Sequence, residues 1–243
     1  VRTMYRLLAA DEASKDRRRQ RPPHRHEVPR LQATAPNQVW TWDITKLPGP
    51  RPGVFYFVYV LLDLFSRYVV GWMVAERENA KLATQFIGDT ITEHGVDADQ
   101  LVLHNDRGAP MTSTNLAQLC ARLGIVQSFS RPRVSDDNPF SESQFKTLKY
   151  QPDYPGRFGS ALHARGWLAS FFGWYNEEHH HEGLALFTPA EVFFGRVDEV
   201  AAQRQVALDA AHHAHPERFV RGRPVVARPP SVVRINHVPM AHE

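Results

Sequence analysis

The chain between residues 38 and 76 consists of short apolar runs separated by turn residues. The runs at residues 39–47, 54–63 and 67–76 are rich in β-branched and aromatic side chains, and Pro/Gly or Asp-Ser turns separate them. Because the connections are short, consecutive strands should pair side by side. The pattern therefore predicts an antiparallel three-stranded meander.

A helical period replaces the strand pattern after residue 78. Residues 79–95 read as a helix that ends at Gly95, and a short apolar strand follows at residues 101–106. The apolar residues expected on one face of this helix are Leu82, Phe86 and Ile87. A strand reached through a helical crossover adds to a sheet in parallel, so the meander should continue into a mixed sheet.

The helix and strand order then repeats. A helix with Thr112 as its N-cap leads to a strand at residues 125–129, and a polar loop at residues 130–139 leads to a helix at 140–150. A further aromatic helix follows at residues 161–180. These elements predict an α/β fold with a mixed five-stranded sheet flanked by helices.

Both ends of the chain differ from this centre. Residues 1–35 read as the end of a helix followed by a basic linker, residues 36–196 as the sheet domain, and residues 197–243 as a helical segment with an Arg/Pro-rich tail. We expect residues 10–35 to lack a core of their own and to be extended or disordered without a bound polyanion. Because the chain opens on Val within a helical segment, we also expect further protein to precede it.

Charge is unevenly distributed along the chain. The formal net charge is +3, yet residues 1–30 hold nine Lys/Arg against four Asp/Glu, and residues 216–234 hold five Arg against one acid. Basic arms around an acidic centre suit a protein that binds a polyanion. The lone Cys120 excludes a disulfide framework, and we interpret it as a small buried hydrophobe. No apolar run reaches eighteen residues and no secretory signal is present, which predicts an intracellular, cytoplasmic protein.

Three acidic residues are placed where acids need a function or a partner. Asp43 lies inside a strand, Asp106 follows the end of another strand, and Glu142 lies near a helix start after Asn138 and Pro139. If they converge, they repel one another, and divalent cations would neutralise them. Oxygen-only ligands select Mg²⁺ or Mn²⁺.

The spacing of these acids and the sequence around them resemble a known family. Asp106 and Glu142 are separated by 35 residues. The blocks WTWDITKL, LLDLFSRYVVGW, LHNDRGAPMTS, DNPFSESQFKTLKY and WYNEEHHHEGLALFTPAEV are similar to those of bacterial insertion-sequence transposases of the DDE type, encoded in the second reading frame. The resemblance implies a ribonuclease-H-like, retroviral-integrase-like catalytic core.

The resemblance also implies an activity. Asp43, Asp106 and Glu142 would hold two Mg²⁺ or Mn²⁺ ions that serve DNA cleavage at transposon ends and strand transfer, with a circular intermediate. The implied partners are double-stranded DNA, further copies of the chain and a helix-turn-helix protein from the upstream reading frame. Two alternatives stay open, namely a ribonuclease-H-type nuclease and an inactive DNA-binding remnant.

Several basic residues are candidate DNA contacts. Lys146 and Lys149 follow Glu142 by four and seven residues and share its helical face. The other candidates are Arg131 and Arg133 in the polar loop, Arg17, Arg18 and Arg19 in the basic arm, and His181. Relatives commonly have Arg at the position of His179, which weakens any phosphate contact there. We expect the run of three histidines to be helical, with side chains in different directions, and not to bind zinc.

Other conspicuous residues have simpler interpretations. We interpret Asp63 as a structural turn acid rather than a fourth metal ligand. Asp136 and Asp137 lie in a polar loop, where solvation or contact with DNA is expected. Trp40 and Trp42 should belong to the core or cover the sheet.

Overall fold

The structure is a computed structural model that describes residues 3–4, 6–7, 26–96, 98–132 and 134–236. Its strands are β1 (Leu31–Ala33), β2 (Val39–Pro48), β3 (Phe55–Asp63), β4 (Val69–Ala75), β5 (Val102–Asn105), β6 (Val126–Phe129) and β7 (Val233–Ile235). Its α-helices are α2 (Ala80–Glu93), α3 (Thr114–Leu123), α4 (Pro139–Lys149), α5 (Ala161–Glu177), α6 (Pro189–Phe193) and α7 (Val197–Ala214). The 3₁₀ turns are η1 (Ala98–Gln100), η2 (Ser135–Asp137), η3 (Glu182–Leu184) and η4 (Pro216–Arg218).

The central sheet has the strand order β4-β3-β2-β5-β6. Strands β2, β3 and β4 pair antiparallel, whereas β5 pairs parallel to β2 and to β6. The predicted meander and its parallel extension through helical crossovers are therefore confirmed. The long β2 is the axis of the sheet and contributes a residue to the candidate site.

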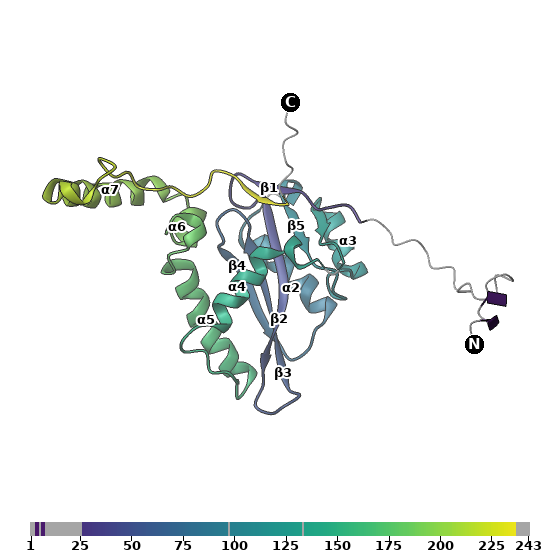
Figure 1. The fold of residues 1–243 in the computed structure, drawn as a ribbon. Coiled ribbons are helices and arrows are strands. Elements are labelled where there is room, and N and C mark those ends of the chain that lie inside the picture. The colour runs from purple at the N-terminus through teal and green to yellow at the C-terminus, as the bar shows by residue number, and fades with distance from the viewer. Residues whose placement is uncertain (1–2, 5, 8–25, 97, 133, 237–243) are drawn as a thin grey trace.

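Helices cover both faces of the sheet (Figure 1). Alternate residues of β3 enter different cores because successive side chains of a strand point to opposite faces. Tyr59 and Leu61 join a core that includes residues of α2 and α3, and Val58 and Val60 join one that includes residues of α4 and α5. Trp40, Trp42 and Cys120 are buried in the first core, as the sequence predicts.

A second, two-stranded sheet joins segments from the two ends of the chain. β1 pairs antiparallel with β7, with Leu31 opposite Ile235, and Ala33 is buried in the small core beneath them. The expectation that residues 10–35 lack a core is thus wrong for residues 31–33. A strand of three residues has no readable period, and its partner lies 202 residues away. Residues 10–25 lie outside the described residues.

Three local predictions need correction. The N-cap of α3 is Ser113, whose Oγ accepts from the Leu116 amide, rather than Thr112. On α2, Ile87 is buried as predicted and Phe86 packs against the core, but Leu82 is 41% exposed, and Ala83 and Ile91 complete the buried face. Helix α5 ends at Glu177, so the three histidines after it are not helical.

Helix α7 and the segment that follows it extend away from the sheet before the chain returns to form β7 (Figure 1). Of the residues in α7, only Ala201 is buried. In the described part of the chain, no helix combines the length and apolar character that crossing a membrane requires.

Candidate active site

Asp43 lies in the middle of β2, on the face of the sheet that packs against α4. Two residues earlier, Thr41 Oγ1 accepts from Ser141 Oγ of α4 at 3.1 Å, and Leu47 of the same face lies in the core beneath α4 and α5. Asp43 Oδ1 accepts from the adjacent Ile44 amide at 2.7 Å. Strand alternation therefore turns this carboxylate toward the helix that carries Glu142.

Asp106 and Glu142 line one cavity of about 340 Å³ at the end of β5. Asp106 directly follows β5, and its Oδ1 is buried with no hydrogen-bond partner among the described residues. Glu142 is in the first turn of α4, which Pro139 begins. Phe145 and Leu148 are buried and dock the helix onto the sheet. The end of strand β5 and the start of helix α4 thus place the two acids at the same cavity. Sites in open α/β sheets commonly form at the carboxyl ends of the strands.

The three acids interact electrostatically. The pKa of Asp43 is raised from an ordinary 3.8 to about 7. Burial is the largest cause and the nearby charges of Asp106 and Glu142 add to it, whereas the Ile44 amide and Lys149 oppose the rise. Removing Asp43 from water and placing it near two carboxylates both disfavour its ionised form. A bound cation would oppose both effects. Among the described residues, no three acidic, histidine or cysteine side chains are grouped closely enough to form a ready-made metal site.

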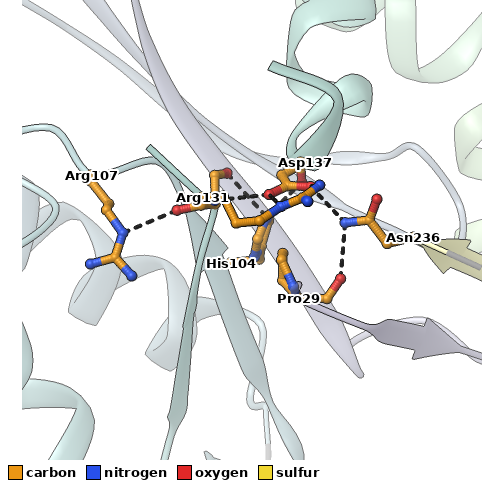
Figure 2. A network of polar contacts seen from close by, with 7 residues as sticks. Pro29, His104, Arg107, Arg131, Asp137 and Asn236 are labelled. Atoms are coloured by element: carbon orange, nitrogen blue, oxygen red, sulfur yellow. Dashed lines mark hydrogen bonds and ion pairs between the residues drawn. The ribbon is translucent and has the colours of Figure 1, made fainter. Parts of the chain in front are cut away.

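The loop between β6 and α4 is held by Asp137, which is fully buried (Figure 2). Its carboxylate accepts from the Arg131 amide at 2.8 Å and from Arg131 Nε and Nη2, each at 2.9 Å. These bonds hold the pKa of Asp137 at about 2. The expectation that Asp137 is solvated or contacts DNA is therefore wrong, because its acceptors are used inside the protein. Asp136 is exposed.

Asp63 is a structural turn acid, as predicted. It is fully buried at the end of β3, where Oδ1 accepts from the Ser66 amide and hydroxyl and Oδ2 accepts from the Asn37 amide. Burial raises its pKa, and these hydrogen bonds oppose the rise. The bonds close the β3–β4 turn, in which Arg67 has a φ of 64°. Because both carboxylate oxygens of Asp63 accept hydrogen bonds within this turn, its role is structural and it does not belong to the candidate site.

The candidate DNA contacts differ in their surroundings. Lys146 and Lys149 are exposed on α4, and Lys149 interacts with Asp43. Partial burial lowers the pKa of Lys149, and its attraction to Asp43 opposes that shift. Arg131 lines the cavity of Asp106 and Glu142 while it is paired with Asp137. Arg133, Arg17, Arg18 and Arg19 lie outside the described residues.

His181 is placed differently from what its sequence context suggests. It caps the turn η3, where its Nδ1 accepts from the Gly183 amide at 3.0 Å, and its backbone bridges to Phe187. Burial, the positive charge of Arg67 and the neighbouring His179 together lower its pKa to about 4. A neutral imidazole that caps a turn provides no charge for a phosphate, so its assignment to DNA binding stays a prediction that the geometry disfavours.

Two residues near the site were missed from the sequence. His104 is buried on β5, with Nδ1 3.0 Å from Ser128 Oγ and Nε2 2.8 Å from the carbonyl oxygen of Asp137. The sequence signal that could have identified His104 is its position two residues before Asp106, because alternate residues of a strand lie on the same face. Asn236 donates to Asp137 Oδ1 at 2.7 Å. No local pattern marks it, because its partner lies 99 residues away in the chain.

Comparison with known proteins adds family information to this geometry. Two family models described as an integrase core domain match the chain, one over residues 33–135 and the other over residues 123–189. The chain is 32% identical over 163 residues to the transposase for insertion sequence element IS904 of Lactococcus lactis, covering 66% of this chain and 63% of that protein. It is 30% identical over 119 residues to the transposase InsF for insertion sequence IS3A of Escherichia coli, covering 49% of this chain and 40% of that protein.

Solved structures extend the likeness to the fold. A chain in the simian T-cell lymphotropic virus intasome, solved in complex with a PP2A regulatory subunit, matches with a TM-score of 0.52 and 19% identity, over 72% of this chain and 61% of that one. At this identity the likeness concerns the fold alone, and it confirms the fold class expected from the sequence. The chain spans less than two thirds of the length of both curated relatives.

Proposed function

The chain belongs to the integrase core domain family, and from this membership we propose that it is the catalytic part of an insertion-sequence transposase. The observation that carries the proposal is the electrostatic coupling of Asp43 to Asp106 and Glu142 beside an open cavity. The substrate is double-stranded DNA at the ends of the element. The reaction class is metal-dependent phosphoryl transfer.

The residues of the site suit a hard divalent cation. The donors are carboxylate oxygens, and one of them, Asp106 Oδ1, is buried with no partner in the part of the chain that the structure describes. An orphaned buried acceptor is costly unless a cation or a donor reaches it. Asp43, Asp106 and Glu142 would hold Mg²⁺ or Mn²⁺, and we propose two ions. When bound, such ions activate the attacking oxygen and stabilise the leaving oxygen of a phosphodiester.

The protein itself supplies position and charge. Asp43 is fixed by strand β2, and Glu142 by a helix that is anchored through Phe145 and Leu148. No protein nucleophile is needed, because the attacking group is water in the cleavage step and the freed 3′-hydroxyl of DNA in strand transfer. Lys146 and Lys149, exposed on the helix of Glu142, would bind phosphates beside the scissile bond.

The assembly around this site is also a proposal. Strand transfer joins DNA ends, so two or more copies of the chain would act together on DNA in the cytoplasm. A helix-turn-helix protein from the upstream reading frame would supply further DNA binding. Basic residues of the C-terminal segment are available for target or end DNA, because Arg218 and Arg221 are exposed.

A strand-transfer assay tests the proposed function. The chain would be incubated with Mg²⁺ and labelled duplexes that carry the ends of its own insertion sequence, and nicked and joined products would be separated by size. We expect both products from the wild-type chain, neither from Glu142→Gln, and both from the control Glu93→Gln, which changes an exposed acid on α2.

The same assay separates the two alternatives. Nicked products without joined products would indicate a ribonuclease-H-type nuclease. Binding of terminal DNA without either product would indicate an inactive remnant and would refute catalysis.

A further inference from the structure

Asn236, just after β7, connects three segments that are distant in the sequence (Figure 2). Its side-chain nitrogen donates to Asp137 Oδ1 at 2.7 Å and to the carbonyl oxygen of Pro29 at 3.0 Å. Pro29 precedes β1, and Asp137 belongs to the loop before α4. One amide group therefore ties the N-terminal segment and the C-terminal segment to that loop.

The position of Asn236 is built for this contact. Its φ is 55°, in the left-handed region, where asparagine is tolerated better than most residues. The β1–β7 pairing, with Leu31 opposite Ile235, brings the residue over Asp137. A charge-assisted hydrogen bond to a fully buried carboxylate is among the stronger polar contacts in a protein.

The loop that Asn236 holds forms part of the cavity wall. Arg131, the other partner of Asp137, lines the cavity together with Asp106 and Glu142, and its side chain is 30% exposed. The carbonyl oxygen of Asp137 lies 2.8 Å from His104 Nε2 on β5. The carboxylate of Asp137 is thus shared between a residue that faces the cavity and a residue of the C-terminal segment.

We infer that Asn236 is a positioning residue for the active site: docking of β7 against β1 sets the loop of residues 130–138 and thereby orients Arg131 beside Asp106 and Glu142. This inference rests on the proposed function. The basic segment of residues 216–234 ends within β7. The part of the chain suited to DNA is therefore continuous with the strand whose docking holds the cavity wall. Loss of this tie should slow the reaction more than it weakens DNA binding.

The test uses the full chain and two variants of Asn236. Asn236→Gly keeps the left-handed backbone accessible and removes the amide. Asn236→Asp keeps the side-chain shape but places a second carboxylate against Asp137. The matched control is Gln32→Ala, which removes the bond from Arg234 Nε to Gln32 Oε1 between the same two strands without touching the loop.

Two measurements are made on each protein. The first is hydrogen–deuterium exchange in peptides that cover residues 130–138, without DNA or metal. The second is the rate of strand transfer as a function of DNA concentration. We expect loop exchange about tenfold faster and kcat about tenfold lower in both Asn236 variants, with KM within about twofold of wild type, because a hydrogen bond to a charged group is lost. Gln32→Ala should resemble wild type in both measurements.

Each other outcome has a stated meaning. Faster loop exchange with unchanged kcat would overturn the positioning role, and so would Asn236 variants that match Gln32→Ala. Faster exchange throughout the chain would show that the variant is generally unfolded. The other Asn236 variant would then decide whether Asn236 positions the loop. A wild-type chain without strand transfer would refute the proposed function instead, and the exchange comparison alone would then decide whether the tie exists.

Discussion

Replacement of Asp137 by asparagine is the perturbation whose cost can be worked out most fully. The substitution keeps the shape of the side chain but removes the charge that accepts three hydrogen bonds from Arg131 and one from Asn236. It also turns one acceptor into a donor that faces an N–H group of Arg131 in either orientation of the new amide. We therefore expect Asp137→Asn to fold but to be less stable than wild type.

The magnitude follows from the shift in pKa. The pKa of Asp137 falls from an ordinary 3.8 to about 2, chiefly because of the hydrogen bonds from Arg131. A shift of one pKa unit corresponds to about 1.4 kcal/mol, so the charge contributes up to about 2.5 kcal/mol. Because the Arg131 side chain is 30% exposed, solvent screening reduces this contribution, and we expect a loss of about 1 to 2 kcal/mol at pH 7.

The pH dependence has a defined sign. A carboxylate with a lowered pKa stabilises the folded state fully above its unfolded pKa, and this contribution is lost as the pH falls through the folded pKa. Urea unfolding of wild type and Asp137→Asn should therefore give a constant difference in the free energy of unfolding from pH 7 to about pH 5. The difference should shrink between about pH 4 and pH 2. Equal stabilities at pH 7, or a difference that grows in acid, would refute this reasoning.

Two further predictions concern DNA. Lys146→Ala combined with Lys149→Ala should weaken binding of terminal DNA and lower the slope of log affinity against log salt by up to about two units, if each lysine neutralises one phosphate. An unchanged slope in a binding titration would show that neither lysine neutralises a phosphate. Asp43→Asn, Asp106→Asn and Glu142→Gln should each abolish cleavage and strand transfer while DNA affinity stays near wild type. Retention of strand transfer by one variant would remove that residue from the site.

The central sheet could be predicted from the sequence because its strands are long enough to show a pattern. β2 and β3 carry β-branched and aromatic residues between clear turn signals, and the crossovers through α2 and α3 follow helical spacing. The small sheet was missed for the opposite reason. β1 and β7 have three residues each, and a pairing between the two ends of the chain leaves no local signal.

The candidate site shows the same division. Asp43, Asp106 and Glu142 are conspicuous because acids in a strand, after a strand and at a helix start need an explanation. Asp137 looks solvated in the sequence, since its partners Arg131 and Asn236 become visible only once the loop and β7 are folded. Long-range polar contacts depend on tertiary packing, which single-residue patterns do not contain.

Binding of Mn²⁺ tests most directly the claim that Asp43, Asp106 and Glu142 form one cation site. Free Mn²⁺ would be titrated by electron paramagnetic resonance against wild type, against Asp43→Asn, Asp106→Asn and Glu142→Gln, and against the control Asp136→Asn, which changes an exposed acid of the neighbouring loop. We expect wild type and the control to bind alike and each carboxylate variant to bind at least about tenfold more weakly, because each loses one charged oxygen ligand. Affinity equal to wild type in any of the three carboxylate variants would contradict a shared site.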